Sequence, residues 1–246
     1  MRALPTTRSL GAALTATILL ALAWGGPAAA GETAAVTPDR GRTALLITDP
    51  QNDFMAETGA AWGLVKDNVL RLETRENIER LMKAAKNSDL PVFVSPHFYY
   101  PHDQSWQARG TIQHALAEIG MFQVAGSTDY QGFEGSGADF YAPLKKYILD
   151  GETVIASPHK VYGPDSSDLA LQLRKRGIDT VIVGGFAANL CTDSHMRELI
   201  EQGFQVIMVE DAVGAPGEEA YQAALLNYGM IANAVWSTET VEAFLK

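Results

Sequence analysis

Three reactive side chains stand directly after hydrophobic runs that are typical of buried β-strands. They are Asp49 after residues 43–48, Lys160 after residues 153–157 and Cys191 after residues 180–185. Ligands of an open parallel sheet bind beyond the carboxyl ends of its strands, so these groups are expected at one edge. A thiolate is a good nucleophile, a carboxylate can carry its proton, and an ammonium stabilises negative charge. The pattern predicts nucleophilic catalysis by Cys191, with Asp49 as proton shuttle and Lys160 as the cation.

The local sequence around Cys191 supports a reactive thiol. Residues 192–199, "TDSHMREL", begin a predicted helix, so the first N–H groups and the helix dipole would point at the sulfur. A helix start and a nearby ammonium both lower the pKa of a cysteine. Cys191 is the only cysteine, which excludes an intrachain disulfide and a site built from several cysteines. We therefore expect a free, activated thiol.

Short apolar runs alternate with helical patterns along the chain. Strands are predicted at 43–48, 91–95, 153–157, 180–185, 205–210 and 233–238. Helices are predicted at 67–86, 168–176, 192–202, 217–228 and 238–245. This alternation predicts an α/β fold of three layers, doubly wound around a six-stranded, mostly parallel sheet. In the common strand order 3-2-1-4-5-6, the first and fourth strands are neighbours, so Asp49 and Cys191 would face each other.

Residues 97–152 form a long insertion between the second and third predicted strands. The insertion is rich in aromatic residues, and 111–122 has a helical pattern. Insertions of this length in a compact domain are usually functional or helical. The insertion is either a wall of the ligand pocket or a second small core, and both can hold. Residues 132–140, "GFEGSGADF", lack the spacing of a phosphate-binding loop and are interpreted as turns.

The first thirty residues have the pattern of a secretory signal. Arg2 and Arg8 precede an apolar stretch, and small residues precede Gly31. We expect export to the periplasm or the medium, a flexible leader at 31–42 and one domain at 43–246. The formal net charge of −10 argues against nucleic acid as a partner, and against a membrane after signal cleavage.

Two segments carry a resemblance to a known family. "LLITDPQNDF" at 45–54 and "GGFAANLCTDSHMREL" at 184–199, with a lysine after the third strand, resemble the isochorismatase-like cysteine hydrolases. The resemblance covers about residues 43–240 and implies a catalytic triad of Asp49, Lys160 and Cys191. It also implies a cis peptide bond between Phe186 and Ala187. The oxyanion hole would be formed by the backbone N–H groups of Ala187 and Cys191.

The resemblance also implies a reaction and a homo-oligomer. A cysteine nucleophile favours hydrolysis of a C–N bond in a small amide or ureide through a thioester. Gln51 is expected to brace its loop. The candidate pocket residues are Phe54, His97, Trp106, Tyr162 and Phe186. Two alternatives remain: a vinyl-ether hydrolase of the isochorismatase type, and a binding protein of this fold without turnover.

A metal is not expected. Nicotinamidases of this family carry an Asp-x-His…His metal site after the second strand, and Ser95 stands here at the position of the aspartate. His97 and His102 remain as possible ligands, but two histidines without a carboxylate make a poor metal site. The sequence therefore predicts a site with neither metal nor cofactor.

Overall fold

The structure, a computed structural model, describes residues 36–124 and 132–246. The predicted signal at 1–30 lies outside the described residues. Within the expected leader, Arg40–Arg42 form a 3₁₀ turn, and the side chain of Asp39 accepts the N–H of Gly41 at its start. The described residues contain no helix long and apolar enough to cross a membrane.

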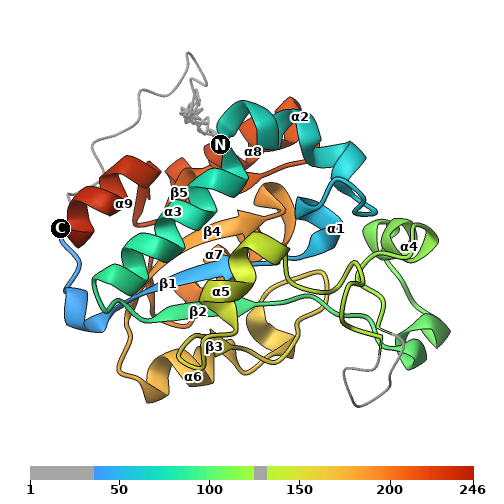
Figure 1. Ribbon diagram of the computed structural model, residues 1–246, viewed down its shortest axis with the longest axis horizontal. Coiled ribbons are helices and arrows are strands. Elements are labelled where there is room, and N and C mark those ends of the chain that lie inside the picture. Colours follow the sequence, from blue (N-terminus) through green and yellow to red (C-terminus); the bar gives the residue numbers. More distant parts are fainter. Residues whose placement is uncertain (1–35, 125–131) are drawn as a thin grey trace, which may run out of the picture. The chain divides into compact units, whose positions relative to one another are not determined.

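Six strands form one sheet with the predicted order β3-β2-β1-β4-β5-β6 (Figure 1). The strands are β1 (Thr43–Thr48), β2 (Val92–Ser95), β3 (Val154–Ile155), β4 (Thr180–Phe186), β5 (Gln205–Gly214) and β6 (Ala234–Trp236). Every pairing is parallel, so the sheet is entirely rather than mostly parallel. Thr48, at the end of β1, pairs with Ser95 of β2 and Gly185 of β4. The carboxyl ends of the three central strands therefore lie side by side.

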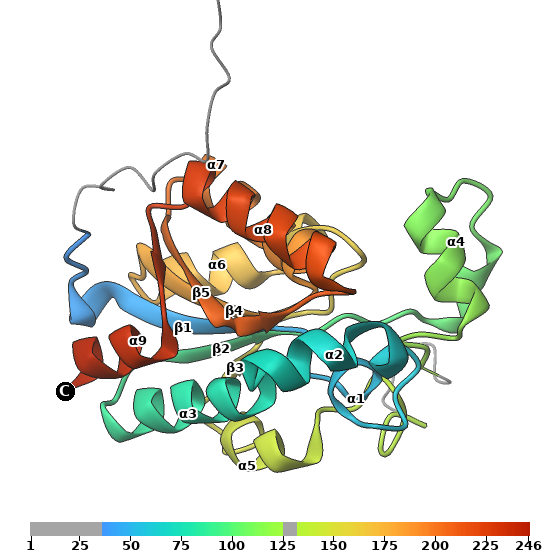
Figure 2. The same ribbon diagram turned by 90° about the horizontal axis from the view of Figure 1, so that it is seen from above.

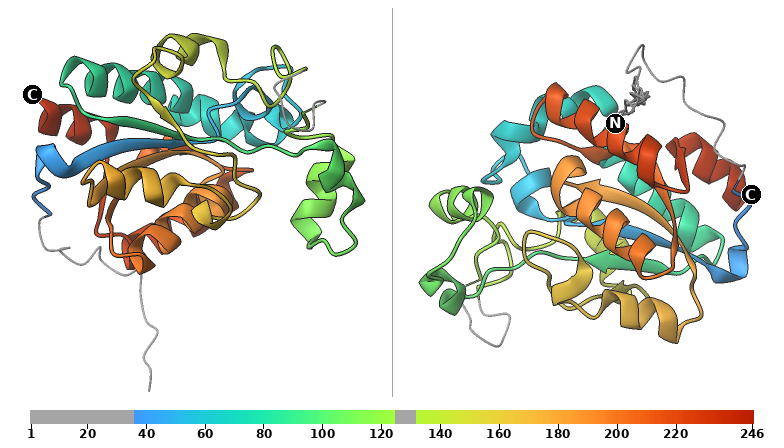
Figure 3. Two further views of the ribbon diagram at one scale, coloured as in Figure 1. Left: turned by 90° about the horizontal axis from the view of Figure 1, so that it is seen from below. Right: turned by 180° about the vertical axis from the view of Figure 1, so that it is seen from behind.

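Helices cover both faces of the sheet (Figures 2 and 3). One layer holds α2 (Trp62–Leu72), α3 (Thr74–Asn87), α5 (Lys145–Ile148) and α9 (Thr238–Leu245). The opposite layer holds α6 (Leu169–Lys175), α7 (Asp193–Glu201) and α8 (Glu218–Ile231). The first layer buries side chains such as Ile78 and Leu81, and the second buries Leu173 and Met196. The strands are apolar on both faces because both faces pack against helices.

Several elements differ in length from the sequence-based expectation, such as β5, which continues to Gly214, and two of the differences have a clear physical reason. The helix predicted at 67–86 is two helices, because Glu73 adopts a left-handed conformation with φ of 54° between α2 and α3. The third strand is only Val154–Ile155, shorter than 153–157. It lies at the edge of the sheet, and Ile155 is 38% exposed, so less apolar surface is buried there.

The aromatic insertion begins beyond the carboxyl ends of the strands and returns to the sheet as α5. It contains α4 (Thr111–Glu118), and a short helix, α1 (Asn52–Met55), follows β1 nearby (Figure 2). Phe98, Val124 and Ala138 form the second small core that the sequence left as one alternative. The buried carboxylate of Asp53 accepts the N–H groups of Ala60 and Phe122, which ties the insertion to the loop after β1.

Candidate active site

Asp49 and Cys191 meet at the carboxyl ends of β1 and β4, as the strand order predicts. Asp49 follows β1 directly and has a left-handed φ of 49°. Cys191 lies in a π-helical turn, Ala188–Thr192, between β4 and α7. Both side chains are buried: Asp49 has no exposed area and Cys191 is 4% exposed. A nucleophile and a carboxylate thus share one buried corner at the end of the sheet.

The thiol of Cys191 is not activated in the resting structure. Burial raises its pKa well above the usual value, and the negative charge of Asp49 raises it further. The backbone N–H groups of Ala187 and Cys191 act in the opposite direction, but they do not outweigh burial. The expected lowering of this pKa by the helix start is therefore wrong. Cys191 rests as a thiol that needs a base, and Asp49 is the adjacent one.

This raised pKa leads to a testable expectation. Alkylation of Cys191 by iodoacetamide, measured against pH, should give an apparent pKa above that of the unfolded chain. Asp49→Asn should lower the apparent pKa, because it removes the second-largest cause of the shift. The apparent pKa is taken from the shape of the pH curve and not from the absolute rate, because burial slows alkylation at every pH. A folded protein whose Cys191 reacts fully as thiolate at neutral pH would contradict the expectation.

His159, rather than Lys160, contacts Asp49. The Nε2 atom of His159 lies 2.8 Å from Oδ1 of Asp49, and both side chains are fully buried. The Nζ atom of Lys160 instead bonds Asp103 and, at 2.9 Å, the backbone oxygen of Phe98. Lys160, which the sequence predicts as the cation of the site, therefore makes no contact with Asp49 in the structure.

Lys160 is held by the aromatic insertion. Its ammonium lies 4.8 Å from the ring centroid of Tyr100, 5.6 Å from that of Tyr99 and 5.9 Å from that of Trp106. Cation–π contacts at these distances, together with the ion pair to Asp103, fix the ammonium on the insertion. His159 and Lys160 lie in an extended segment, in which adjacent side chains point to opposite sides. His159 therefore faces Asp49, and Lys160 faces the insertion.

Both ring nitrogens of His159 face an acceptor. Nδ1 contacts the backbone oxygen of Lys160, and Nε2 contacts the carboxylate of Asp49. A carbonyl and a carboxylate are both acceptors, so both ring nitrogens donate only when the ring is an imidazolium. The charge that the sequence assigned to Lys160 is then supplied by His159.

One backbone feature beside Cys191 is as the resemblance implies. The peptide bond between Phe186 and Ala187 is cis. The hydroxyl of Thr48 lies 3.1 Å from the oxygen of Phe186 and 2.9 Å from the hydroxyl of Thr192. The backbone N–H groups of Ala187 and Cys191 lower the pKa of the sulfur, so they lie beside the attacking atom. An oxyanion hole needs such donors, and this assignment to Ala187 and Cys191 stays a prediction.

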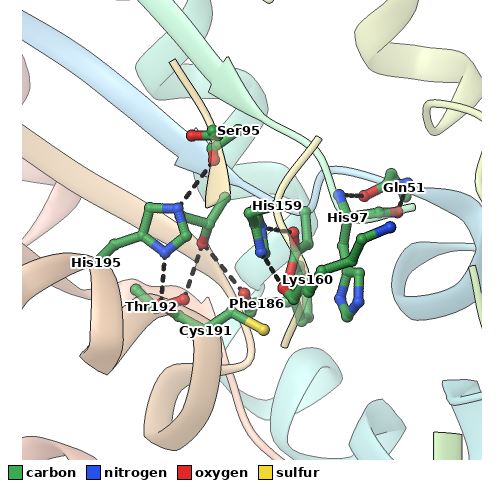
Figure 4. Close-up of polar contacts among 12 residues, drawn as sticks. Gln51, Ser95, His97, His159, Lys160, Phe186, Cys191, Thr192 and His195 are labelled. Carbon is green, nitrogen blue, oxygen red and sulfur yellow. Dashed lines mark hydrogen bonds and ion pairs between the residues drawn. The ribbon is translucent and has the colours of Figure 1, made fainter. Parts of the chain in front are cut away.

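His195 is a site residue that the sequence interpretation missed. Its Nδ1 donates to the backbone oxygen of Cys191 at 2.7 Å, and its Nε2 accepts from the hydroxyl of Ser95 at 2.9 Å (Figure 4). Burial, followed by the charge of His159, lowers its pKa well below the usual value, so the ring is neutral. The sequence does contain a signal for this residue: His195 follows Cys191 by four positions, so both side chains lie on the same side of the helix start.

His97 lies in the same buried corner without a polar partner for its ring. Neither ring nitrogen has a hydrogen bond to the described residues. The pKa of His97 is lowered well below its usual value, mainly by burial and then by His159. Its backbone N–H donates to Gln51, whose side-chain amide donates to the oxygens of His97 and Ala138. Gln51 braces the loop, as predicted.

The other predicted pocket residues divide into buried and exposed ones. Phe54 stacks on Phe186 with ring centroids 5.1 Å apart, next to the cis bond. Trp106 contacts Tyr99 edge to face at 5.7 Å. Tyr162 is 55% exposed and lies near Tyr99, whose pKa it helps to raise, so its place in the pocket stays a prediction.

The residues present do not fit the metal site of the nicotinamidases. The hydroxyl of Ser95 offers no carboxylate and already bonds His195. The side chain of His102 is 65% exposed and pairs with Asp103 at 3.5 Å. Within the described ranges, His97, His159 and Cys191 are the one group of three side chains whose spacing suits a metal ion.

Comparisons with known proteins agree with this fold and indicate a family. The isochorismatase domain family matches residues 43–240. YwoC, an isochorismatase family protein of Bacillus subtilis, is 38% identical over 80 residues, which is 32% of this chain and 41% of YwoC. Ureidoacrylate amidohydrolase RutB of Variovorax paradoxus is 24% identical over 193 residues, which is 74% of this chain and 72% of RutB. A cysteine hydrolase structure from Pseudomonas syringae superposes with a TM-score of 0.68 at 20% identity, covering 85% of this chain and 94% of the other.

Proposed function

The chain belongs to the isochorismatase-like hydrolase family, and we propose that it is a cysteine hydrolase cleaving the C–N bond of a small amide or ureide. The observation that carries the proposal is the buried corner that Cys191 shares with Asp49, whose Oδ2 atom has no hydrogen bond to the described residues. A thiol with a raised pKa needs a neighbouring base, and a carboxylate at this position can serve as one.

The reaction follows from these groups. Asp49 accepts the proton of Cys191 as the sulfur attacks the carbonyl carbon, and the N–H groups of Ala187 and Cys191 stabilise the oxyanion. The tetrahedral intermediate collapses, and Asp49 returns the proton to the leaving nitrogen. Asp49 then deprotonates a water that attacks the thioester, which releases the acid and restores the thiol. His159 stays beside Asp49 throughout and balances its charge.

Unpartnered polar atoms around Cys191 favour a small polar substrate. These atoms are Oδ2 of Asp49, both ring nitrogens of His97 and the hydroxyl of Tyr99. A buried polar group without a partner costs about 1–3 kcal/mol, so an occupant with donors and acceptors would be stabilised there. The aromatic rings of Phe54 and Phe122, 5.4 Å apart, add an apolar boundary. The likeness to ureidoacrylate amidohydrolase supports the inclusion of ureides.

Ammonia release from the purified protein across a panel of small amides and ureides tests this function. We expect saturable turnover of at least one compound, and none by a folded Cys191→Ser variant purified in parallel. If no compound in the panel is hydrolysed but one binds at Cys191, the protein is a binding protein. Cleavage of a vinyl ether without need for the thiol would favour the isochorismatase-type reaction instead.

We also propose that the protein is exported and that the mature chain begins at Gly31. This proposal is supported by the order of basic, apolar and small residues in 1–30. Intact-mass measurement of the protein from its native host should show a chain that starts at Gly31, outside the cytoplasm. A chain that retains Met1–Ala30 and is active in the cytoplasm would contradict this.

A further inference from the structure

Three side chains from three different strand ends converge on one point. His97 follows β2, His159 follows β3 and Cys191 follows β4, and each offers a ligand atom within 4.8 Å of the other two. His97 and His159 are fully buried and Cys191 is 4% exposed. The proposed hydrolysis uses Cys191 and His159, but it gives no fixed partner to the ring of His97.

His97 is the observation that points to a ligand. It is fully buried, and neither of its ring nitrogens has a hydrogen bond to the described residues. Its ring centroid lies 5.1 Å from that of His159. A buried imidazole without a partner, beside a thiol, offers a free ring nitrogen to a cation that prefers nitrogen and sulfur.

We propose that a divalent ion of the zinc class binds His97, His159 and Cys191, and that the bound ion blocks the nucleophile. Two imidazoles and one thiolate are ligands that zinc prefers, and magnesium and calcium prefer oxygen. Zinc bonds of about 2.0–2.3 Å place tetrahedral ligand atoms roughly 3.3–3.6 Å apart, so the ligand atoms must approach by about 1 Å.

Binding of the ion is balanced in protons and charge. The S–H bond of Cys191 breaks, a sulfur–metal bond forms, and the proton passes to solvent. Nε2 of His159 also releases its proton and turns from Asp49 to the metal, and its Nδ1–H keeps the bond to the oxygen of Lys160. The thiolate and the freed carboxylate of Asp49 then balance the two charges of the ion.

This site shares only His97 with the metal site of the nicotinamidases, and its effect is opposite. It uses the nucleophile as a ligand, so the ion inhibits the protein and is not required by it. The proposal does not depend on the substrate, because binding is measured without one. Failure of the metal site and failure of the proposed hydrolysis can therefore be told apart.

The test uses the purified, metal-free protein with zinc and cadmium as probes. Equilibrium dialysis should give one bound ion per chain for zinc and for cadmium, and none for magnesium. Cadmium should produce the ultraviolet absorption of a cadmium–thiolate bond, and zinc should protect Cys191 from alkylation. A chelator should reverse both effects. Absence of saturable zinc binding, or a bound ion that leaves Cys191 fully open to alkylation, would overturn the proposal.

Matched variants locate the ion. His97→Gln should weaken zinc binding by about 100-fold or more, and Cys191→Ser should remove the cadmium–thiolate absorption. His102→Gln is the control: its side chain is exposed and lies outside the cluster, so binding should be unchanged. Near-ultraviolet circular dichroism confirms folding, and Cys191→Ser serves alone if His97→Gln does not fold. Binding that survives Cys191→Ser and is lost in His102→Gln would place the ion elsewhere and refute the assignment.

Discussion

Cys191→Ala is expected to abolish amide hydrolysis, with a loss of at least about 10⁴-fold in kcat, and to leave the protein folded. Cys191 supplies the attacking sulfur, and Asp49 cannot replace it because a carboxylate there serves only to move the proton. The side chain is small, so its removal from a buried position should cost roughly 1–3 kcal/mol of unfolding free energy. Ammonia release measures the first effect and thermal unfolding the second.

Trapping the thioester intermediate on Cys191 tests the same prediction more directly. Enzyme quenched during turnover should carry an acyl group on the peptide that contains Cys191, detected by mass spectrometry. The matched control is Thr192→Ser, which alters the neighbouring buried residue but keeps the hydroxyl that faces Thr48. The Thr192→Ser variant should still carry the acyl group on Cys191. A folded Cys191→Ala protein with near-normal ammonia release would falsify the nucleophilic mechanism.

The arrangement of the sheet could be predicted because it depends on patterns that the sequence carries directly. Runs such as 180–185 are apolar on both faces, and only a parallel sheet covered by two helix layers buries both. That arrangement brings Asp49 and Cys191 together at neighbouring strand ends. The division of α2 from α3 depends on one left-handed residue, Glu73, which a helical periodicity of apolar positions does not reveal.

The details of the site could not be predicted because they depend on the register of the segments beyond the strand ends and on how deeply each side chain is buried. His159 and Lys160 are adjacent, and which one faces Asp49 is fixed by the pairing of His159 with His97 beyond the strand ends. A shift of one residue would exchange their directions. The sign of the pKa shift at Cys191 depends on how completely the insertion and the helices bury the thiol. A helix start is visible in the sequence, but burial is not.

His159→Gln is expected to lower kcat by about 10²-fold or more, because it removes the cation beside Asp49 and keeps a side chain of similar size. His159→Lys restores a positive charge at that position and should recover at least tenfold of the loss. A merely structural role for the imidazole would give no such recovery, since lysine matches its charge and not its shape. Steady-state kinetics with the best substrate of the panel measures both variants, with thermal unfolding as the check on folding.

The matched control removes Lys160 together with its partner. Lys160→Met combined with Asp103→Asn eliminates the ion pair without leaving Asp103 as an unpaired buried charge, which alone would cost about 3–5 kcal/mol. Because Lys160 faces the insertion and not Asp49, the double variant should keep kcat within about tenfold of the parent. The opposite result is equally clear. If the double variant is inactive and His159→Gln is active, then Lys160 turns toward Asp49 during catalysis, and it is the third catalytic residue that the resemblance implies.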